Sequence, residues 1–316
     1  MRCYVYSKNM LFGVILDKLG LALFGHFSRN WIGVLGVLIS LCTCPIIAQY
    51  TTGKSTPVEP RVRAVHDVQT QTVAPVNADS IFQYAQTVSF AGFRWKVRES
   101  NVQTEPGNNF FSKSESEIFI DNTEKLHLRI GPRNGYWYCS ELVADTILGY
   151  GTYAIFPEIM LDTLPPNIMI EFGLTPDKAL HTYIPSDIAV RFTRLGTLNS
   201  PNTLQYVISR PENANERKER LFRPEEPFRM QGSFSTHAFT WRESVLEFAS
   251  YHDHGLPTPY LAALWEFSGS QALNLSVPKA TTPYRMRLRV WSAGSPITNR
   301  PFDLTIKNIQ FFPLKR

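Results

Sequence analysis

The hydrophobic residues alternate with a period of two over most of the chain, from about residue 82 to the C-terminus. The segment KLHLRIG, for example, places Leu126, Leu128 and Ile130 on one face of an extended strand. No segment with a helical period is comparably strong. The pattern therefore predicts an all-β fold, a two-sheet antiparallel β-sandwich or jelly roll. Further strand-length segments bounded by turn residues are 93–100, 150–160, 167–177, 204–211, 244–253, 284–294 and 302–314.

One polar segment interrupts this series. ENANERKERLF, residues 212–222, contains few apolar positions. We predict a loop or a single surface turn there.

The N-terminal region has a different composition. Residues 31–48 are uncharged and follow Arg29, which predicts a secretion signal cleaved after Ala48. The alternative is an uncleaved membrane tether through the same residues, since 18 apolar residues just span a bilayer. Both alternatives predict an extracytoplasmic protein that is secreted, periplasmic or anchored at the cell surface. Met10 is an alternative start of the chain.

Three segments follow from these patterns. Residues 1–48 are the signal peptide or anchor, and residues 49–81, rich in Thr, Val and Pro, form a flexible linker. Residues 82–316 form the β-domain. Aromatic residues make up 13% of the chain, which also contains 22 Pro and 18 Gly, as expected for strands joined by many turns.

The charge and the cysteine content limit the possible partners and disulfides. The chain carries a net charge of +5, but four of its 32 basic and one of its 27 acidic residues precede residue 49. The remaining 28 basic and 26 acidic residues give a net charge of +2, which does not predict a nucleic-acid partner. Cys139 is the only cysteine beyond residue 48, so the domain has no internal disulfide. Nothing in the sequence sets the oligomeric state.

Several segments, in this order and spacing, resemble a known family. They are FAGFRWKVRES, EPGNNFFS, LHLRI…NGYWYCSELVADTILGYGTYAIFP, STHAFTWRESVLEFASYHDHG, YRMRLRVWSAGSP and FDLTIKNIQFFP. Together they resemble the bacterial family-16 glycoside hydrolases, the laminarinase- and lichenase-like β-glucanases with a concanavalin-like jelly roll. The resemblance extends from about residue 90 to residue 313. It implies two antiparallel sheets, a β-glucan-like polysaccharide ligand and no cofactor.

The chemistry of that family resides in a strand that reads E-x-D-x-E, often followed by F-[ST]-x-[WL]-G. In this chain FTRLG begins at Phe192. Counting back from it, the three acid positions are Asp187, Ala189 and Arg191. The resemblance thus implies a strand at the catalytic position, crossing the concave face, from which most of the acids are missing.

The substitutions bear directly on hydrolysis. A retaining glycosidase needs two carboxyl groups about 5–5.5 Å apart, one as nucleophile and one as acid/base. Asp187 could act as a nucleophile, but the guanidinium of Arg191 releases no proton at a working pH. General acid–base catalysis contributes about 10²–10⁴-fold, so hydrolysis is expected to be impaired. An alternative for Asp187 and Arg191 is an ion pair on the sheet surface.

A second alternative is an active hydrolase whose acids have moved to other strands. Glu141, Glu158 and Glu171 lie on neighbouring predicted strands and are the candidates. Each could equally be a surface residue or form a local salt bridge.

Sugar binding requires no acid, because aromatic faces and a few fixed polar groups suffice. The candidate substrate-binding residues are Trp137, Glu141, His181 and Trp291. For both tryptophans a place in the cleft and a place in the core remain open. Trp95 and Trp241 are predicted to lie in the core.

Two further patterns bear on ligands. Arg285, Arg287 and Arg289 alternate along one strand and share a face with Trp291, which predicts either a solvated sheet face or a basic wall for an acidic polysaccharide. His252 and His254 lack the additional ligands of a metal site, so no metal is expected. The sequence therefore predicts an exported carbohydrate-binding protein with impaired hydrolysis. The alternative is an active retaining β-glucanase.

Overall fold

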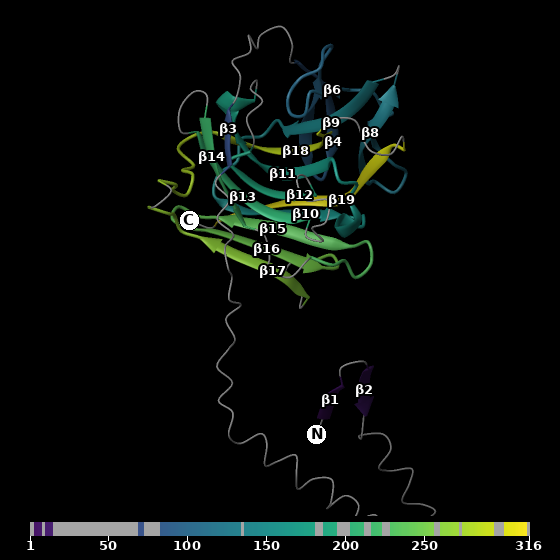
Figure 1. Ribbon diagram of the computed structural model, residues 1–316, viewed down its shortest axis with the longest axis vertical. Coiled ribbons are helices and arrows are strands. Elements are labelled where there is room, and N and C mark those ends of the chain that lie inside the picture. The colour runs from purple at the N-terminus through teal and green to yellow at the C-terminus, as the bar shows by residue number, and fades with distance from the viewer. Residues whose placement is uncertain are drawn as a thin grey trace, which may run out of the picture. The chain divides into compact units, whose positions relative to one another are not determined.

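The computed structural model describes residues 3–7, 10–14, 69–72, 83–133, 136–180, 186–194, 203–211, 216–222, 228–255, 260–271, 274–293 and 300–314 (Figure 1). The chain divides into two units, Met1–Arg61 and Val62–Arg316. In the first unit, β1 (Cys3–Ser7) and β2 (Met10–Val14) pair as an antiparallel hairpin. No helix in the described part of the chain is long and apolar enough to cross a membrane. The predicted signal or tether, residues 31–48, lies outside the described residues.

The second unit is built from two sheets, which confirms the predicted all-β sandwich (Figure 1). The first sheet is antiparallel throughout. Its strands, in spatial order, are β4 (Gln83–Phe90), β5 (Phe93–Glu99), β9 (Tyr136–Ala144), β18 (Tyr284–Ser292), β11 (Ile168–Pro176), β12 (Ile188–Thr193), β13 (Leu204–Pro211), β14 (Glu216–Phe222) and β3 (Gln69–Thr72).

The second sheet is also antiparallel. Its strands are β7 (Ile118–Ile120), β8 (Leu126–Arg133), β19 (Phe302–Pro313), β10 (Gly151–Pro157), β15 (Ser235–Trp241), β16 (Leu246–His252) and β17 (Leu261–Phe267). Beyond the end of β18, β9 pairs with β8 and, in parallel, with β6 (Phe110–Phe111), and these contacts join the two sheets. Two short 3₁₀ turns, η3 (Leu161–Thr163) and η4 (Asp177–Ala179), precede and follow β11.

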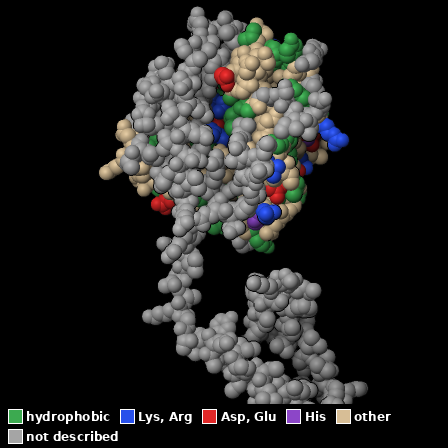
Figure 2. Space-filling model, viewed as in Figure 1, with side chains coloured by type: hydrophobic (Ala, Val, Ile, Leu, Met, Phe, Trp, Pro, Cys, Tyr) green, Lys and Arg blue, Asp and Glu red, His purple; other side chains and the backbone are tan. Residues whose placement is uncertain are grey.

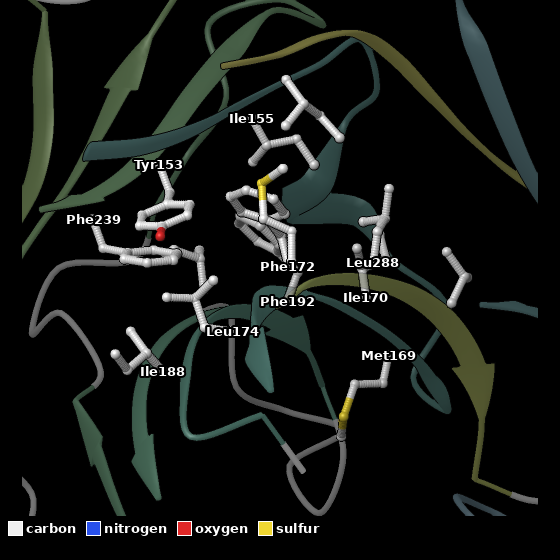
Figure 3. Packing of buried hydrophobic residues seen from close by; sticks show 14 of the residues in the cluster. Tyr153, Ile155, Met169, Ile170, Phe172, Leu174, Ile188, Phe192, Phe239 and Leu288 are labelled. Carbon is white, nitrogen blue, oxygen red and sulfur yellow. The ribbon is translucent and has the colours of Figure 1, made fainter. Parts of the chain in front are cut away.

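The core lies between the sheets and is rich in aromatic rings (Figure 3). Phe172 of β11 meets Phe239 of β15 with ring centroids 6.0 Å apart. Tyr206 of β13 stacks on Phe248 of β16, and its hydroxyl donates a hydrogen bond to the Ser250 hydroxyl at 2.8 Å. The alternation of apolar residues is thus sufficient to explain how the layers meet, because each strand turns every second side chain inward.

Two tryptophans predicted to lie in the core are found there. Trp95 and Trp241 are fully buried. Their indole N–H groups donate to the carbonyls of Phe90, at 3.1 Å, and Pro278, at 2.9 Å. Both predictions are confirmed, and each buried indole has its hydrogen-bond partner.

The prediction for residues 212–222 is wrong. Glu216–Phe222 forms β14, which pairs with β13 on one side and β3 on the other. The Phe222 ring stacks on Trp265 of β17 at 5.3 Å, and the other residues of the strand are mostly charged in sequence. Edge-proximal strands tolerate such charge, and a pattern based on apolar alternation misses them.

Part of the predicted linker, residues 49–81, is also a strand. Gln69–Thr72 forms β3, the last strand of the first sheet in the described part of the chain. A four-residue strand of Gln and Thr is held by its backbone hydrogen bonds, and such pairing leaves no hydrophobic signal in the sequence.

The visible surface of the second unit carries a mixture of side chains. In its described part, charged side chains of both signs lie among apolar and uncharged polar ones (Figure 2). Isolated apolar side chains are normal on a solvent-facing surface, so this view by itself identifies no binding patch.

Candidate functional site

A row of charged side chains crosses the middle of the first sheet. In the register of neighbouring strands, Glu141 lies opposite Arg289, which lies opposite Glu171, which in turn lies opposite Arg191. The sign of the charge alternates from strand to strand. Each of these residues is followed or preceded by a core residue that points the other way. These core residues are Leu142, Leu288, Phe172 and Val190.

We call this side of the first sheet the polar face. It is defined by six buried charged residues, Arg98, Glu141, Glu171, Arg191, Arg287 and Arg289. Strand alternation explains the arrangement, because successive side chains of a strand point to opposite faces. Figure 3 shows the effect on β11, where Met169 points away from the labelled core residues Ile170 and Phe172.

Glu171 is the centre of the polar face. Its Oε2 lies 3.0 Å from Nη2 of Arg191, and its Oε1 lies 2.9 Å from Nη2 of Arg289. Nη2 of Arg287 is 3.6 Å from Oε1. The Ser186 hydroxyl donates to the same oxygen at 2.8 Å. Three cations and a hydroxyl therefore hold this carboxylate in place.

Glu141 is held in a similar way at the other end of the row. Nη1 of Arg98 lies 3.0 Å from its Oε2, and the Tyr84 hydroxyl donates to Oε1 at 3.2 Å. Arg98 also donates to the Thr104 hydroxyl at 3.0 Å, and its guanidinium lies 3.7 Å above the Phe111 ring. Both glutamates are thus components of hydrogen-bonded ion pairs.

The pKa values follow from burial and from these arginines. Burial by itself would raise the pKa of Glu171, but Arg289, Arg191 and Arg287 together hold it well below its usual range. Burial also opposes ionisation of Glu141, and there Arg98 is the main group that lowers the pKa. Burial and the neighbouring Arg287 lower the pKa of Arg289 to about 10. Both carboxyl groups are therefore ionised at neutral pH, and neither carries a proton to donate.

The polar face ends in apolar residues. The guanidinium of Arg289 lies 4.4 Å from the centroid of the Trp291 ring, which is 6% exposed. Trp137 is half-buried and, like Trp291, packs against the hydrophobic core. Of the four candidate substrate-binding residues, strand alternation thus brings Glu141, Trp291 and Trp137 to one side of the first sheet, where Glu141 and Trp291 are buried and Trp137 is half-buried. His181 lies outside the described residues.

The strand predicted to contain Ala189 and Arg191 is present as β12. Ala189 and Arg191 share a face, opposite the core residue Val190. Asp187 precedes the strand, and its Oδ2 accepts a hydrogen bond from the hydroxyl of Tyr284, a core residue, at 2.8 Å. Arg191 binds Glu171 of the neighbouring strand β11. The partner of Arg191 could not be deduced from β12 alone.

The three candidates for relocated acids separate clearly. Glu158 forms a 2.5 Å ion pair with Lys125. Its backbone forms an isolated β-bridge with Phe234 next to the second sheet, away from the polar face. Glu141 and Glu171 do lie on the polar face. They flank β18, and since neighbouring strands are about 4.8 Å apart, their backbones are roughly 10 Å apart. Arg289 of β18 lies opposite both glutamates and therefore stands between them.

The alternating arginines of β18 are confirmed to share a face, but the prediction of a solvated face is wrong. Arg287 and Arg289 are buried, and Arg285 is nearly so. Arg285 forms a 2.5 Å hydrogen bond with Asp177. Carboxylates of neighbouring strands neutralise these residues, and a single strand's pattern does not reveal the acids opposite it.

Sequence reasoning missed Glu171 as the centre of the site, although a signal for it exists. Asn167, Met169 and Glu171 have the same i, i+2, i+4 spacing as the E-x-D-x-E motif, and Phe172 follows. Of these three positions, only residue 171 is an acid. The FTRLG pattern instead predicts the motif on the neighbouring strand, β12.

No group of three or more His, Cys, Asp or Glu residues that could hold a metal ion occurs among the described residues. His252 stacks on Phe228 at 5.6 Å, and Nε2 of His254 lies 3.0 Å from the carbonyl oxygen of Pro157. These histidines thus serve packing and hydrogen bonding.

Comparison with known proteins supports the fold. No family model and no curated protein sequence matches the chain. Among solved structures, a protein of Mycobacterium tuberculosis described as Rv0315, an immunostimulatory antigen and pseudo beta-1,3-glucanase, is 15% identical with a TM-score of 0.51. The match covers 70% of this chain and 91% of that one. The Bacillus licheniformis β-glucanase is also 15% identical, with a TM-score of 0.49 over 79% of this chain and all of the other. The expected resemblance to β-glucanases is confirmed at the level of the fold.

Proposed function

We propose that this chain is an exported polysaccharide-binding protein that does not hydrolyse its ligand. One observation carries the proposal. The Glu171 carboxylate is bound by Arg191, Arg289 and Arg287. A general acid must release a proton near neutral pH, and a carboxyl group whose pKa is lowered in this way has none to release.

The fold and its neighbours support the choice of ligand. The β-sandwich is similar to that of the M. tuberculosis protein described as a pseudo beta-1,3-glucanase, which supports a glucan-binding fold whose hydrolysis is impaired. Fold alone does not imply function, so the ligand class is part of the proposal. We propose a β-glucan-like polysaccharide.

The test is a panel of soluble polysaccharides that includes β-1,3- and mixed-linkage β-glucans. Binding is measured by affinity electrophoresis or calorimetry, and cleavage by the release of reducing ends over a day. We expect binding to at least one polymer without reducing ends above a protein-free control. Release of reducing ends by the purified protein would overturn the proposal.

An active hydrolase is the second candidate, and the presence of both Glu141 and Glu171 on the polar face favours it. If the two residues catalyse cleavage, Glu171→Gln must abolish it, while Glu158→Gln, remote from the polar face, must not. We expect no activity in the parent protein for either substitution to remove.

Export is the remaining part of the proposal. The uncharged residues 31–48 after Arg29 support it. Cell fractionation followed by N-terminal sequencing distinguishes the two forms. A chain that begins at residue 49 would indicate cleavage, and an intact N-terminus in the membrane fraction would indicate a tether. A cytoplasmic location would contradict both.

A further inference from the structure

The charged residues of the polar face are buried, so a polymer must bind at an exposed surface. The described residues include an aromatic group on the strands that join the two sheets. Tyr136 and Tyr138 come from β9, Phe110 from β6 and Arg133 from β8. We call these four residues the hairpin stack.

Strand pairing places the hairpin stack on one side of β9. Tyr136 lies opposite Arg133, and Tyr138 lies opposite Gly131 of β8 and beside Phe110 of β6. Alternation turns Trp137 and Glu141 to the other side of β9, towards the polar face. The hairpin stack is therefore a separate surface.

The side chains of the hairpin stack form a continuous series. The Phe110 ring stacks on Tyr138 with centroids 5.2 Å apart and meets the edge of Tyr136 at 5.1 Å. The guanidinium of Arg133 lies 3.9 Å from the Tyr138 centroid.

The stack is both rigid and accessible. Nη2 of Arg133 donates to the Ser112 hydroxyl at 2.9 Å, and its Nη1 lies 3.7 Å from the Glu117 carboxylate. These contacts fix the guanidinium, although the Arg133 side chain is 38% exposed. Tyr136 is 52% exposed. An exposed ring that its neighbours already hold in place loses little conformational entropy when it binds a ligand.

We propose that the hairpin stack binds a pyranose unit of a polysaccharide chain, a proposal that rests on the proposed function. A pyranose has an apolar C–H face that fits the Tyr136 ring and a rim of hydroxyl oxygens. The fixed guanidinium of Arg133 supplies N–H donors to that rim. An extended polymer reaches this surface without entering the buried polar face.

The experiment compares the full chain with three variants, using whichever polysaccharide of the panel the parent protein binds. Tyr136→Ala is expected to weaken binding by about fivefold, since such ring contacts are worth roughly 0.5–1.5 kcal/mol. Tyr136→Phe keeps the ring and is expected to bind within about twofold of the parent protein. Tyr260→Ala is the matched control, because Tyr260 is 56% exposed and adjoins β17 of the second sheet. It is expected to have no effect.

Hydroxyl-radical footprinting gives a second measurement that does not depend on any substitution. The polymer is expected to protect Tyr136 and to leave Tyr260 reactive. If the parent protein and Tyr136→Ala bind the polymer equally well, the proposal for the hairpin stack is overturned and the proposed function stands. A parent protein that binds no polymer would overturn the proposed function and this site together. Sedimentation of the ligand-free proteins is also compared. If Tyr136→Ala sediments differently from the parent protein, the ring contacts another protein chain, and this result also overturns the proposal.

Discussion

Glu171 of β11 lies directly opposite Arg191 of β12, and Nη2 of the arginine is 3.0 Å from Oε2 of the glutamate. The carboxylate shares its other oxygen with Arg289, on the far side of β11. One acid thus bridges two arginines across three strands. Arg191 and Arg289 together neutralise this buried carboxylate.

Removal of Glu171 is expected to destabilise the fold strongly. In Glu171→Ala, Arg191 and Arg289 lose their shared carboxylate, and breaking a buried ion pair costs about 3–5 kcal/mol. Urea denaturation measures the change. The matched control is Glu99→Ala, which removes a half-exposed carboxylate paired with Lys113, and we expect a change within about 0.5 kcal/mol there. Equal effects of the two substitutions would contradict the central role of Glu171.

Stability is expected to fall in acid because of the same glutamates. Burial opposes the ionisation of Glu171 and Glu141, but the neighbouring arginines outweigh it and lower the pKa of both groups. A carboxyl group with a lowered folded pKa contributes its full stability above its unfolded pKa of about 4.3, and the contribution is lost as the pH falls through the folded pKa. Unfolding free energies measured from pH 6 to pH 3 should therefore decrease below about pH 4.5. A Glu141→Gln variant should show a shallower decrease.

His237 predicts a second effect at higher pH. Burial, together with His252 and His254, lowers the pKa of His237 to about 3, and its ring nitrogens contact the hydroxyls of Ser250 and Ser235 at 2.7 and 2.9 Å. The unfolded chain binds a proton at this residue below about pH 6.5, whereas the folded chain does not. Stability should therefore fall by at most about 1.4 kcal/mol per pH unit between pH 6.5 and 4.5. In His237→Gln the slope over this range should decrease, and an unchanged slope would show that other groups cause it.

Cys139 is expected to be unreactive in the folded protein. It is fully buried, and burial raises the pKa of its thiol to about 12. The thiolate is the reactive form, so alkylation at pH 8 should label Cys139 only after unfolding in urea. Peptide mass spectrometry distinguishes it from the cysteines of residues 1–48. Rapid labelling without denaturant would show that β9 opens locally.

The fold could be predicted from the sequence because both sheets bury one face. Period-two alternation in segments such as KLHLRIG marks strands, and Trp95 and Trp241 lie where that pattern places them. The pattern missed two strands, β3 and β14, which pair with each other through their main chains. Hydrogen bonds between main chains do not depend on side-chain identity, so no sequence pattern reports them.

The site was predictable only in part. The alternation of Arg287 and Arg289 with apolar residues correctly predicts a common face. Their burial and their partner Glu171 depend on which strands become neighbours and in which register. A shift of one residue would turn every side chain of a strand to the other face. The cross-strand row of alternating charge therefore became visible only once the strand pairing was known.

Introducing the acid motif on β12 tests whether that strand can carry a catalytic geometry. The triple variant Asp187→Glu, Ala189→Asp, Arg191→Glu has the E-x-D-x-E sequence at 187–191. Ala189 is fully buried opposite Gly173, where a Cβ would already lie 2.8 Å from the Ala189 Cβ, and it packs on Val207.

The triple variant is therefore expected to lose stability and to release no reducing ends. It introduces a buried carboxylate at residue 189 and replaces the cation that binds Glu171 with another anion. Thermal unfolding and the reducing-end assay measure the two effects, with Asp187→Glu alone as the control that leaves Ala189 and Arg191 in place. A folded triple variant that cleaves a β-glucan would contradict both expectations. It would show that the cleft at β12 lacks only the acids, and that the sheet folds without Arg191.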